Sequence, residues 1–304
     1  MSLPPLHGVV PILVTPFHED GRIDEESLAN LVEFNIRAGV HGLGVALGSE
    51  IFKFTEAERA QVTKCVIKAA NKRVPIVINT GAAGTDLAVA YSKAAEAAGA
   101  DMLMVIPPSF MPVSPDEIFD YYVALDRAVN IPIILQDVPQ APISPGLALR
   151  IADACKTVRY IKVETLPVTG KVAAMSSLAG DRLTIFGGAG GSYFIEEMRR
   201  GALGTMPFCS QPADFVAVWD AFQKGDEVTA RRHFDQTIMA INRLGAQSGD
   251  IFYALHKRFL KRRGIIRTAV VRGPTMAIDP ISDREIEELL SLSVPQAQSF
   301  QMLA

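Results

Sequence analysis

The strongest constraint on the fold is a short apolar run followed by an amphipathic stretch, a pattern that recurs eight times along the chain. The runs are continuously apolar rather than alternating, which is typical of strands covered on both faces of a parallel sheet. Successive runs start 19 to 34 residues apart, which leaves room for a crossover helix and is too long for a hairpin. The expected strands start near Gly8, Gly42, Pro75, Met102, Pro132, Tyr160, Leu183 and Ala202.

Four stretches between these runs carry helix signals. Residues 24–38 begin with an aspartate, repeat apolar side chains at helical spacing and end before a glycine. Residues 55–70 begin with Thr-Glu-Ala-Glu, which resembles a capping box, and residues 85–98 and 114–129 follow the same pattern. Eight strand–helix units favour a closed barrel over an open doubly wound sheet, which usually has five or six strands. The predicted fold class is α/β, a (β/α)8 TIM barrel with a C-terminal helical extension.

Beyond the eighth unit the pattern is helical only. The chain has 304 residues, 49% of them hydrophobic, so it can bury a large core and is neither disordered nor a small disulfide scaffold. We expect a barrel domain over residues 1–225 and a helical subdomain over residues 226–304. The expected C-terminal helices cover residues 214–224, 228–246, 251–263 and 283–291.

The charge balance gives no reason to expect a nucleic-acid or membrane partner. The chain carries 30 basic and 33 acidic residues, a formal net charge of −3, whereas such partners attract a basic stripe. One local basic run is interpreted as a solvated helix face, because it is isolated in a near-neutral chain. That run comprises Lys257, Arg258, Lys261, Arg262 and Arg263.

The remaining composition points to a soluble cytoplasmic protein. Cys65, Cys155 and Cys209 are odd in number and far apart, so they predict neither a disulfide framework nor a zinc site. The stretch from Met1 to Phe17 lacks a basic region and contains four prolines, so it does not resemble a signal peptide. The longest apolar runs fall far short of the roughly 18 residues that a membrane span requires.

Lys162 is the first candidate for chemistry, because reactive groups in such barrels lie at the carboxyl ends of the strands. It is the only cation within the predicted strand cores. Burying an ammonium group costs several kcal/mol, whereas a neutral amine costs less and is a nucleophile. Desolvation would lower the pKa of Lys162, as a Schiff-base lysine requires. The alternative is that Lys162 reaches the barrel mouth or pairs with Glu164 or Glu50.

Two turns are candidates for binding an anion. Residues 187–191 form a glycine-rich segment that does not match the dinucleotide fingerprint. It is either a place where the backbone approaches a carboxylate or phosphate, or a tight strand-to-helix turn. In residues 46–50, the N–H groups of Gly48 and Ser49 and the Ser49 hydroxyl could hold a carboxylate, or Ser49 could cap a helix. The five histidines show no paired ligand spacing, so no metal site is expected.

With a lysine in the sixth strand, a Gly-Ser-Glu turn after the second and a proline-rich turn after the fifth, the chain resembles the dihydrodipicolinate synthase and N-acetylneuraminate lyase family over essentially its whole length. The resemblance implies a (β/α)8 enzyme that forms a Schiff base with pyruvate or another 2-keto acid. It implies no cofactor beyond the imine on Lys162, and a homotetramer built from two tight dimers. The motifs that carry it are Val9 to Phe17 with Gly21, Gly42 to Thr55, Pro107-Pro108, Ile133 to Pro139 and Tyr160 to Thr165.

The resemblance also implies roles for individual residues. The imine lysine falls on Lys162, and the turn that binds the keto-acid carboxylate falls on residues 46–48, with Ser49 and Glu50 next. Gly188 corresponds to a glycine near the substrate, and Met206 to an apolar contact from the eighth strand.

The sequence departs from the family at three functional positions. Gln136 replaces a catalytic tyrosine, Ala141 replaces an arginine of the dihydrodipicolinate synthases, and Phe110 replaces the tyrosine that crosses their dimer contact. A glutamine amide does not titrate in the working range, so a tyrosine proton relay is impossible. Without the arginine, the carboxylate of a second substrate lacks a bidentate partner. Activity as a dihydrodipicolinate synthase is therefore not expected.

The Gln-Asp-x-Pro and Lys-x-Glu-Thr motifs most resemble those of 2-keto-3-deoxy-sugar-acid dehydratases, in particular members like L-2-keto-3-deoxyarabonate dehydratase. Lys162 is expected to attack C2, after which the enamine expels the C4 hydroxyl as water or the C3–C4 bond breaks in a retro-aldol step. Gln136 would orient a water molecule or a substrate hydroxyl. The carboxylate would be held by Gly48, Ser49 and Gly188, and the polyol would contact Thr165.

Three readings of the function remain open at this point. The first is a dehydratase or aldolase for a keto sugar acid. The second is a synthase that condenses pyruvate without the tyrosine relay, and the third is a barrel that binds a keto acid without catalysis. The general base is also open, with Glu164, Asp137 or a bound water as candidates.

Overall fold

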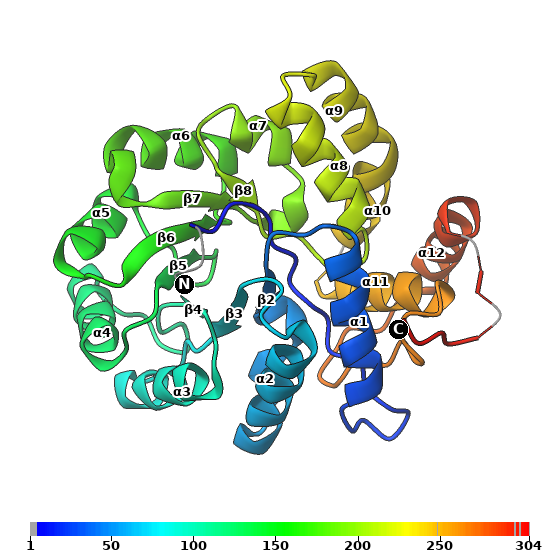
Figure 1. The fold of residues 1–304 in the computed structure, drawn as a ribbon, viewed down its shortest axis with the longest axis horizontal. Helices are drawn as coiled ribbons and strands as arrows, with labels where there is room; N and C mark the ends of the chain where they lie inside the picture. Colours follow the sequence, from blue (N-terminus) through cyan, green and yellow to red (C-terminus); the bar gives the residue numbers. More distant parts are fainter. Residues whose placement is uncertain (1–4, 248, 295, 298, 304) are drawn as a thin grey trace. The chain divides into compact units, whose positions relative to one another are not determined.

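The computed structural model describes residues 5–247, 249–294, 296–297 and 299–303, so the first four residues of the N-terminal stretch lie outside it. Eight parallel strands form one sheet in the order β1-β8-β7-β6-β5-β4-β3-β2, and helices follow the strands along the chain (Figure 1). The predicted (β/α)8 fold and all eight strands are confirmed. The strands are β1 Gly8–Val9, β2 Leu43–Val45, β3 Ile76–Asn79, β4 Met102–Val105, β5 Ile133–Asp137, β6 Val158–Val163, β7 Thr184–Gly187 and β8 Gly204–Thr205.

The chain divides into two compact units. One comprises residues 1–10 and 75–207, and the other comprises residues 11–74 and 208–304. The helices from α8 onward therefore belong to the same unit as β2 and the first two helices. The boundary expected at residue 225 stays a prediction.

In the first unit, helices α3 to α7 lie outside the strands β3 to β8 (Figure 1). Almost every strand residue is buried, which is why the strands appear in the sequence as continuous apolar runs. β6 begins at Val158, two residues earlier than expected, so it also contains Arg159. Lys162 is thus not the only cation of the strands, although Arg159 is exposed and Lys162 is buried. The helices are α3 Thr85–Ala98, α4 Pro115–Ala128, α5 Pro145–Ala154, α6 Val168–Ala179 and α7 Phe194–Met198.

In the second unit, the caps anticipated from the sequence are present. The Asp24 side chain accepts a hydrogen bond from the backbone N–H of Ser27, and Thr55 and Glu58 form a reciprocal capping box. The expected helix over residues 228–246 is α9 and α10 joined by a π-helical turn at Phe234–Ile238. The helices are α1 Glu25–Arg37, α2 Glu56–Ala70, α8 Pro212–Gln223, α9 Glu227–His233, α10 Met239–Gly245, α11 Ile251–Arg262 and α12 Pro280–Ser293.

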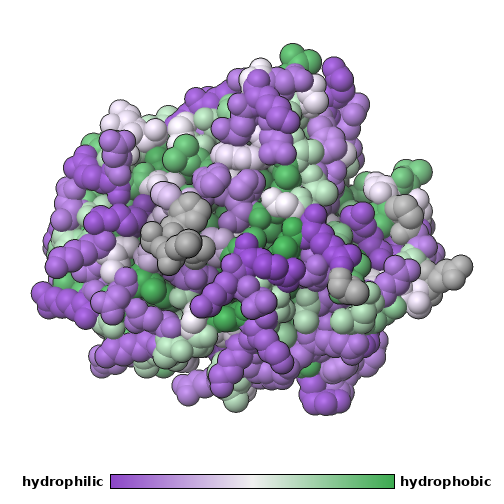
Figure 2. All heavy atoms as spheres, viewed as in Figure 1, coloured by the Kyte–Doolittle hydropathy of each residue, from purple (hydrophilic) through white to green (hydrophobic). Residues whose placement is uncertain are grey.

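The C-terminal helices α10, α11 and α12 pack around an apolar cluster of their own, which includes Leu255, Phe259 and Leu290. Hydrophilic side chains predominate on the face of the molecule drawn in Figure 2, and apolar ones occupy smaller areas between them. Within the described ranges, no helix combines the length and the apolar character needed to cross a bilayer. The three cysteines are all free thiols.

The prediction of a solvated face for the basic run is wrong at Lys257. This side chain is fully buried on α11, and its Nζ lies 2.5 Å from Oε1 of Glu50. A buried ammonium group is tolerated where a carboxylate pairs with it. Lys261 and Arg263 are exposed as expected, and Arg258 pairs with Asp283 of α12.

Candidate active site

Lys162 lies near the carboxyl end of β6 and is only 5% exposed. Its Nζ is 2.9 Å from Oε1 of Glu164. Glu164 follows the last residue of β6, Val163, and its carboxylate is directed to the same side as the amine of Lys162, two residues earlier. Of the alternatives weighed for Lys162, pairing with Glu164 is the one that the structure shows.

The carboxylate of Glu164 contacts residues of β6, of β5 and of the segment after β7, all in the first unit. Besides Lys162, it accepts hydrogen bonds from Nε2 of Gln136 at 3.2 Å and from the backbone N–H of Ala189 at 3.2 Å. Gln136 lies directly opposite Lys162 in the β5–β6 register. Its Oε1 accepts a hydrogen bond from Nδ2 of Asn79 at 2.8 Å, which fixes the orientation of the amide. A hydrogen-bonded chain therefore runs from β3 through β5 to Lys162.

The glycine-rich segment after β7 makes room for this carboxylate. A Cβ added at Gly188 would lie 2.2 Å from Cγ of Glu164, so a larger residue would displace the glutamate. Ala189 adopts a left-handed conformation with φ 49° and directs its N–H at the carboxylate. A short 3-10 turn at Ala189–Gly191 then leads toward α7. The tight-turn interpretation is therefore confirmed, and contact of Gly188 with a substrate stays a prediction.

Asp137, the other carboxylate considered as a base, is committed elsewhere. It follows Gln136 in β5 and so projects from the opposite face. It is fully buried, lies 2.6 Å from Nζ of Lys171 and accepts a hydrogen bond from Oγ1 of Thr165 at 2.6 Å. Glu164 is consequently the candidate base that contacts the lysine. The Thr165 hydroxyl is part of the Asp137 network, and its contact with a polyol stays a prediction.

Two further site candidates lie in the first unit. Met206 follows β8, is 1% exposed and donates its backbone N–H to the carbonyl oxygen of Gly187 at 3.0 Å. Phe110 lies in the loop after β4 and is 84% exposed in the single chain. Contacts of Met206 and Phe110 with a substrate, and of Phe110 with a second copy, stay predictions.

The turn at residues 46–50 belongs to the second unit and uses Ser49 internally. The Ser49 hydroxyl donates to the carbonyl oxygen of Leu13 and accepts from the N–H of Ala46, and the Ser49 N–H donates to the Ala46 carbonyl at 2.8 Å. The N–H of Ser49 is thus used in closing the turn, and its hydroxyl proton is used in binding Leu13 outside the turn. The earlier N–H groups, those of Leu47 and Gly48, have no partner within a turn of this kind. Leu47 and Gly48 are partly exposed, whereas Ser49 is buried.

Glu197 is a buried acid that the sequence analysis missed. Both of its carboxyl oxygens are buried without a hydrogen-bond partner among the described residues, and a Cβ added at Gly187 would lie 1.7 Å from Oε2. Burial, followed by the negative charges of Glu164 and Glu196, raises the pKa of Glu197 to about 8 against the opposing effect of Lys162. The sequence does contain a signal that Glu197 is buried, because it lies on the apolar side of the segment Phe194–Met198. The part of the chain that the structure describes holds no group of three potential metal ligands.

Comparisons with known proteins agree with this architecture. The model of the Dihydrodipicolinate synthetase family matches residues 5–292. The chain is 28% identical to an L-2-keto-3-deoxyarabonate dehydratase of Azospirillum brasilense over 292 residues, 94% of each chain. It is 36% identical to a 4-hydroxy-tetrahydrodipicolinate synthase of Sorangium cellulosum over 242 residues, 76% of this chain and 78% of that one.

A solved structure shows the same fold. The crystal structure of a dihydrodipicolinate synthase from Rhodopseudomonas palustris superimposes with a TM-score of 0.86 at 27% identity, covering 96% of this chain and 99% of that one. The family expected from the motifs is therefore confirmed. This chain belongs to the dihydrodipicolinate synthetase family of aldolases and lyases.

Proposed function

We propose that the protein is a lyase that forms a Schiff base through Lys162 and removes water from a 2-keto-3-deoxy sugar acid. The observation that carries this proposal is the contact between the buried amine of Lys162 and Glu164, whose carboxylate is held by the amide of Gln136. A titratable carboxylate beside the lysine replaces the phenol that position 136 lacks. The A. brasilense relative, a dehydratase for a substrate of this class, supports the same assignment.

In the first step, Glu164, 2.9 Å from Nζ, accepts a proton from Lys162, and the freed amine adds to C2 of the keto acid. A second proton passes from the nitrogen to the C2 oxygen, which gives a carbinolamine. Glu164 then returns its proton to the carbinolamine hydroxyl, which leaves as water. The product is an iminium ion on Lys162, and Glu164 is again a carboxylate.

In the second step, the iminium ion acidifies C3. Glu164 accepts the C3 proton as the C2–C3 enamine forms, and the enamine electrons then expel the C4 hydroxyl. That hydroxyl takes the proton back from Glu164 and leaves as water. Hydrolysis of the unsaturated iminium ion frees Lys162. Gln136 does not titrate, so its part is to hold Glu164 in place, with Asn79 orienting its amide.

Substrate binding follows the family resemblance. We assign the keto-acid carboxylate to the N–H groups of the turn that contains Gly48, which Ser49 closes, and further contacts to Gly188, Met206 and Thr165. The imine on Lys162 is the only covalent group required. A homotetramer of two dimers with Phe110 near the contact, and a cytoplasmic location, complete the proposal.

A pyruvate-condensing synthase is the second candidate, because the S. cellulosum relative is a 4-hydroxy-tetrahydrodipicolinate synthase. It ranks second because Gln136, Ala141 and Phe110 leave neither a tyrosine relay nor an arginine for a second carboxylate.

Borohydride trapping with pyruvate, followed by peptide mass mapping, tests the lysine. A reduced adduct is expected at Lys162 and is expected to be missing from the Lys162→Met variant. The other buried lysine, Lys257, serves as an internal control and should stay unmodified. A folded wild-type protein without the adduct would refute both enzyme candidates and favour a barrel that binds keto acids without catalysis.

A substrate screen then separates the two enzymes. Release of an unsaturated or oxo acid from a 2-keto-3-deoxy sugar acid supports the dehydratase. Condensation of pyruvate with aspartate semialdehyde at a comparable rate would reverse the ranking.

A further inference from the structure

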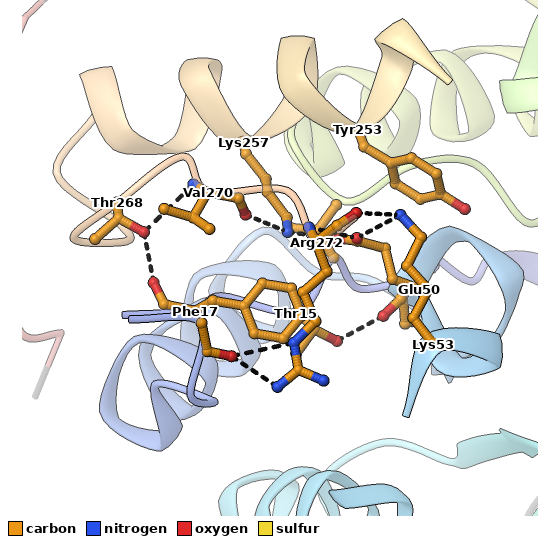
Figure 3. A network of polar contacts seen from close by, with 12 residues as sticks. Thr15, Phe17, Glu50, Lys53, Tyr253, Lys257, Thr268, Val270 and Arg272 are labelled. Carbon is orange, nitrogen blue, oxygen red and sulfur yellow. Dashed lines mark hydrogen bonds and ion pairs between the residues drawn. The ribbon is translucent and has the colours of Figure 1, made fainter. Parts of the chain in front are cut away.

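Helix α11 contacts the turn at residues 46–50 through two side chains that the mechanism does not use. The Tyr253 hydroxyl donates to the carbonyl oxygen of Leu47 at 2.7 Å. Nζ of Lys257 donates to Oε1 of Glu50 at 2.5 Å (Figure 3). Tyr253 and Lys257 are four residues apart and therefore lie on the same side of the helix. One face of α11 thus holds both the beginning and the end of the turn, all within the second unit.

The end of the turn is fixed by the carboxylate of Glu50. Glu50 is buried, and its backbone is in the left-handed region with φ 60°. A residue other than glycine rarely adopts this conformation unless its surroundings stabilise it. Its Oε2 accepts hydrogen bonds from Nζ of Lys53 and from the N–H of Arg272, both at 3.1 Å (Figure 3). Together with Lys257, three donors from three segments hold the carboxylate and keep the turn closed.

Lys257 is itself engaged in the same network. Its Nζ also donates to the carbonyl oxygen of Val270 at 2.7 Å and lies 4.3 Å from the centre of the Phe17 ring (Figure 3). Two of the three ammonium donors are thus used inside the protein, and the Phe17 ring lies against the nitrogen, so Lys257 acts as a structural cation.

The bond from Tyr253 acts on the part of the turn that is accessible. The Leu47 carbonyl and the Gly48 N–H belong to one planar trans peptide unit and point in opposite directions. Fixing the carbonyl oxygen with the Tyr253 hydroxyl therefore fixes the direction of the Gly48 N–H and polarises it. This control matters because glycine permits peptide rotations that other residues resist. Leu47 and Gly48 are partly exposed, while the rest of the turn is buried.

We propose that Tyr253 is a positioning residue that aims the Gly48 N–H at the carboxylate of a 2-keto acid, while Lys257 and Glu50 hold the other end of the turn. This inference rests on the proposed function, because that proposal makes the turn the carboxylate-binding element. It adds that α11, in the C-terminal helical segment, determines how tightly the substrate carboxylate is held.

The test is the Tyr253→Phe variant, which lacks one hydroxyl and leaves the Leu47 carbonyl with its other donor, the Glu50 N–H at 3.0 Å. The half-saturating pyruvate concentration in borohydride trapping is expected to rise about three- to tenfold, since one hydrogen bond to a carbonyl is lost. The limiting yield of adduct at saturating pyruvate should stay within about twofold of wild type. Pyruvamide, which lacks the carboxylate charge, should be affected less than pyruvate.

The matched control is Thr15→Val. The Thr15 hydroxyl donates to the Ser49 carbonyl at 2.8 Å, so this variant also removes one hydrogen bond to the turn. The Ser49 carbonyl shares its peptide unit with the Glu50 N–H, which already donates to Leu47 inside the turn. Thr15→Val is therefore expected to lower stability while leaving the half-saturating pyruvate concentration within about twofold.

The outcomes separate the two proposals. A wild-type protein that forms no adduct at Lys162 overturns the proposed function and this inference with it. A wild-type protein that is trapped, with unchanged half-saturation in Tyr253→Phe, overturns the inference alone. Equal shifts for pyruvate and pyruvamide, or for Tyr253→Phe and Thr15→Val, also overturn it, because they would indicate general loosening of the turn.

Discussion

Replacing Glu197 with glutamine should change how the stability of the protein depends on pH. Burial raises the pKa of this carboxyl from its ordinary 4.5 to about 8, with Glu164 and Glu196 adding to the shift. Because the folded state binds the proton more tightly, the stabilisation is fully present below pH 4.5. It is lost as the pH rises through 8. A glutamine side chain has nearly the same shape as protonated glutamate and is also uncharged, but it does not titrate in this pH range.

The size of the effect follows from the two pKa values. A shift of about 3.5 units corresponds to about 5 kcal/mol between the acidic and alkaline limits, at 1.36 kcal/mol per unit. Between pH 5 and pH 7.5, the stability of the wild type relative to Glu197→Gln should fall by about 3 kcal/mol. For a chain of this length that is a relative shift in Tm of about 6 °C, at about 2 °C per kcal/mol.

The assay is thermal or urea unfolding of wild type and variant at half-unit pH intervals. Shared groups that do not interact with Glu197 cancel in the difference, so the slope reports Glu197 together with its coupling to Glu164, Glu196 and Lys162. The control is Glu196→Gln, which removes the half-buried neighbouring carboxylate of α7 and leaves Glu197 in place. A flat difference for Glu197→Gln would refute the reasoning, because it would mean that this carboxyl titrates alike in the folded and unfolded chain.

Three further changes test the site and its supports. Glu164→Gln should lower kcat for dehydration by about 10²- to 10⁴-fold and should also slow the trapping of pyruvate, and near wild-type turnover would exclude Glu164 as the base. Gly188→Ala places a methyl group 2.2 Å from Glu164 Cγ and should lower kcat by about 10²-fold, because it displaces the glutamate. The control is Gly146→Ala, whose added methyl group has no atom within 4 Å, and its kcat should equal that of wild type. Equal kcat values for the two variants would contradict the close approach of Gly188 to Glu164. Lys257→Met leaves Lys53 as the remaining ion-pair partner of the buried Glu50 carboxylate and should lower the free energy of unfolding in urea by about 3 kcal/mol; the loss should be smaller when the Glu50 carboxylate is removed as well.

Much of the fold follows from local signals that the sequence contains. Thr55 and its glutamate three residues later form the expected capping box, and the continuous apolar runs are the buried strands. These signals are local because a cap involves neighbours in the chain and because both faces of a parallel strand are covered. The strand starts and the helices were therefore predictable to within a few residues, and so was the position of Lys162 in β6.

The roles of the charged side chains depended on tertiary structure. The sequence left Glu164, Asp137 and a bound water open as candidate bases. In the folded chain, Gln136, opposite Lys162 in the β5–β6 register, and the N–H of Ala189 hold Glu164, whereas Asp137 pairs with Lys171. Lys257 looked like part of a solvated run because its carboxylate partner, Glu50, lies 207 positions away in the chain.

The amino-acid sequence by itself determined the repeating units, their helix caps and the strand that carries the lysine, since neighbouring residues create those preferences. The folded chain alone decided which carboxylate meets that lysine, which cation is buried and which acid is left without a partner. Those outcomes depend on groups brought together from distant segments, where burial and pairing, rather than local propensity, set the free energy of a charge.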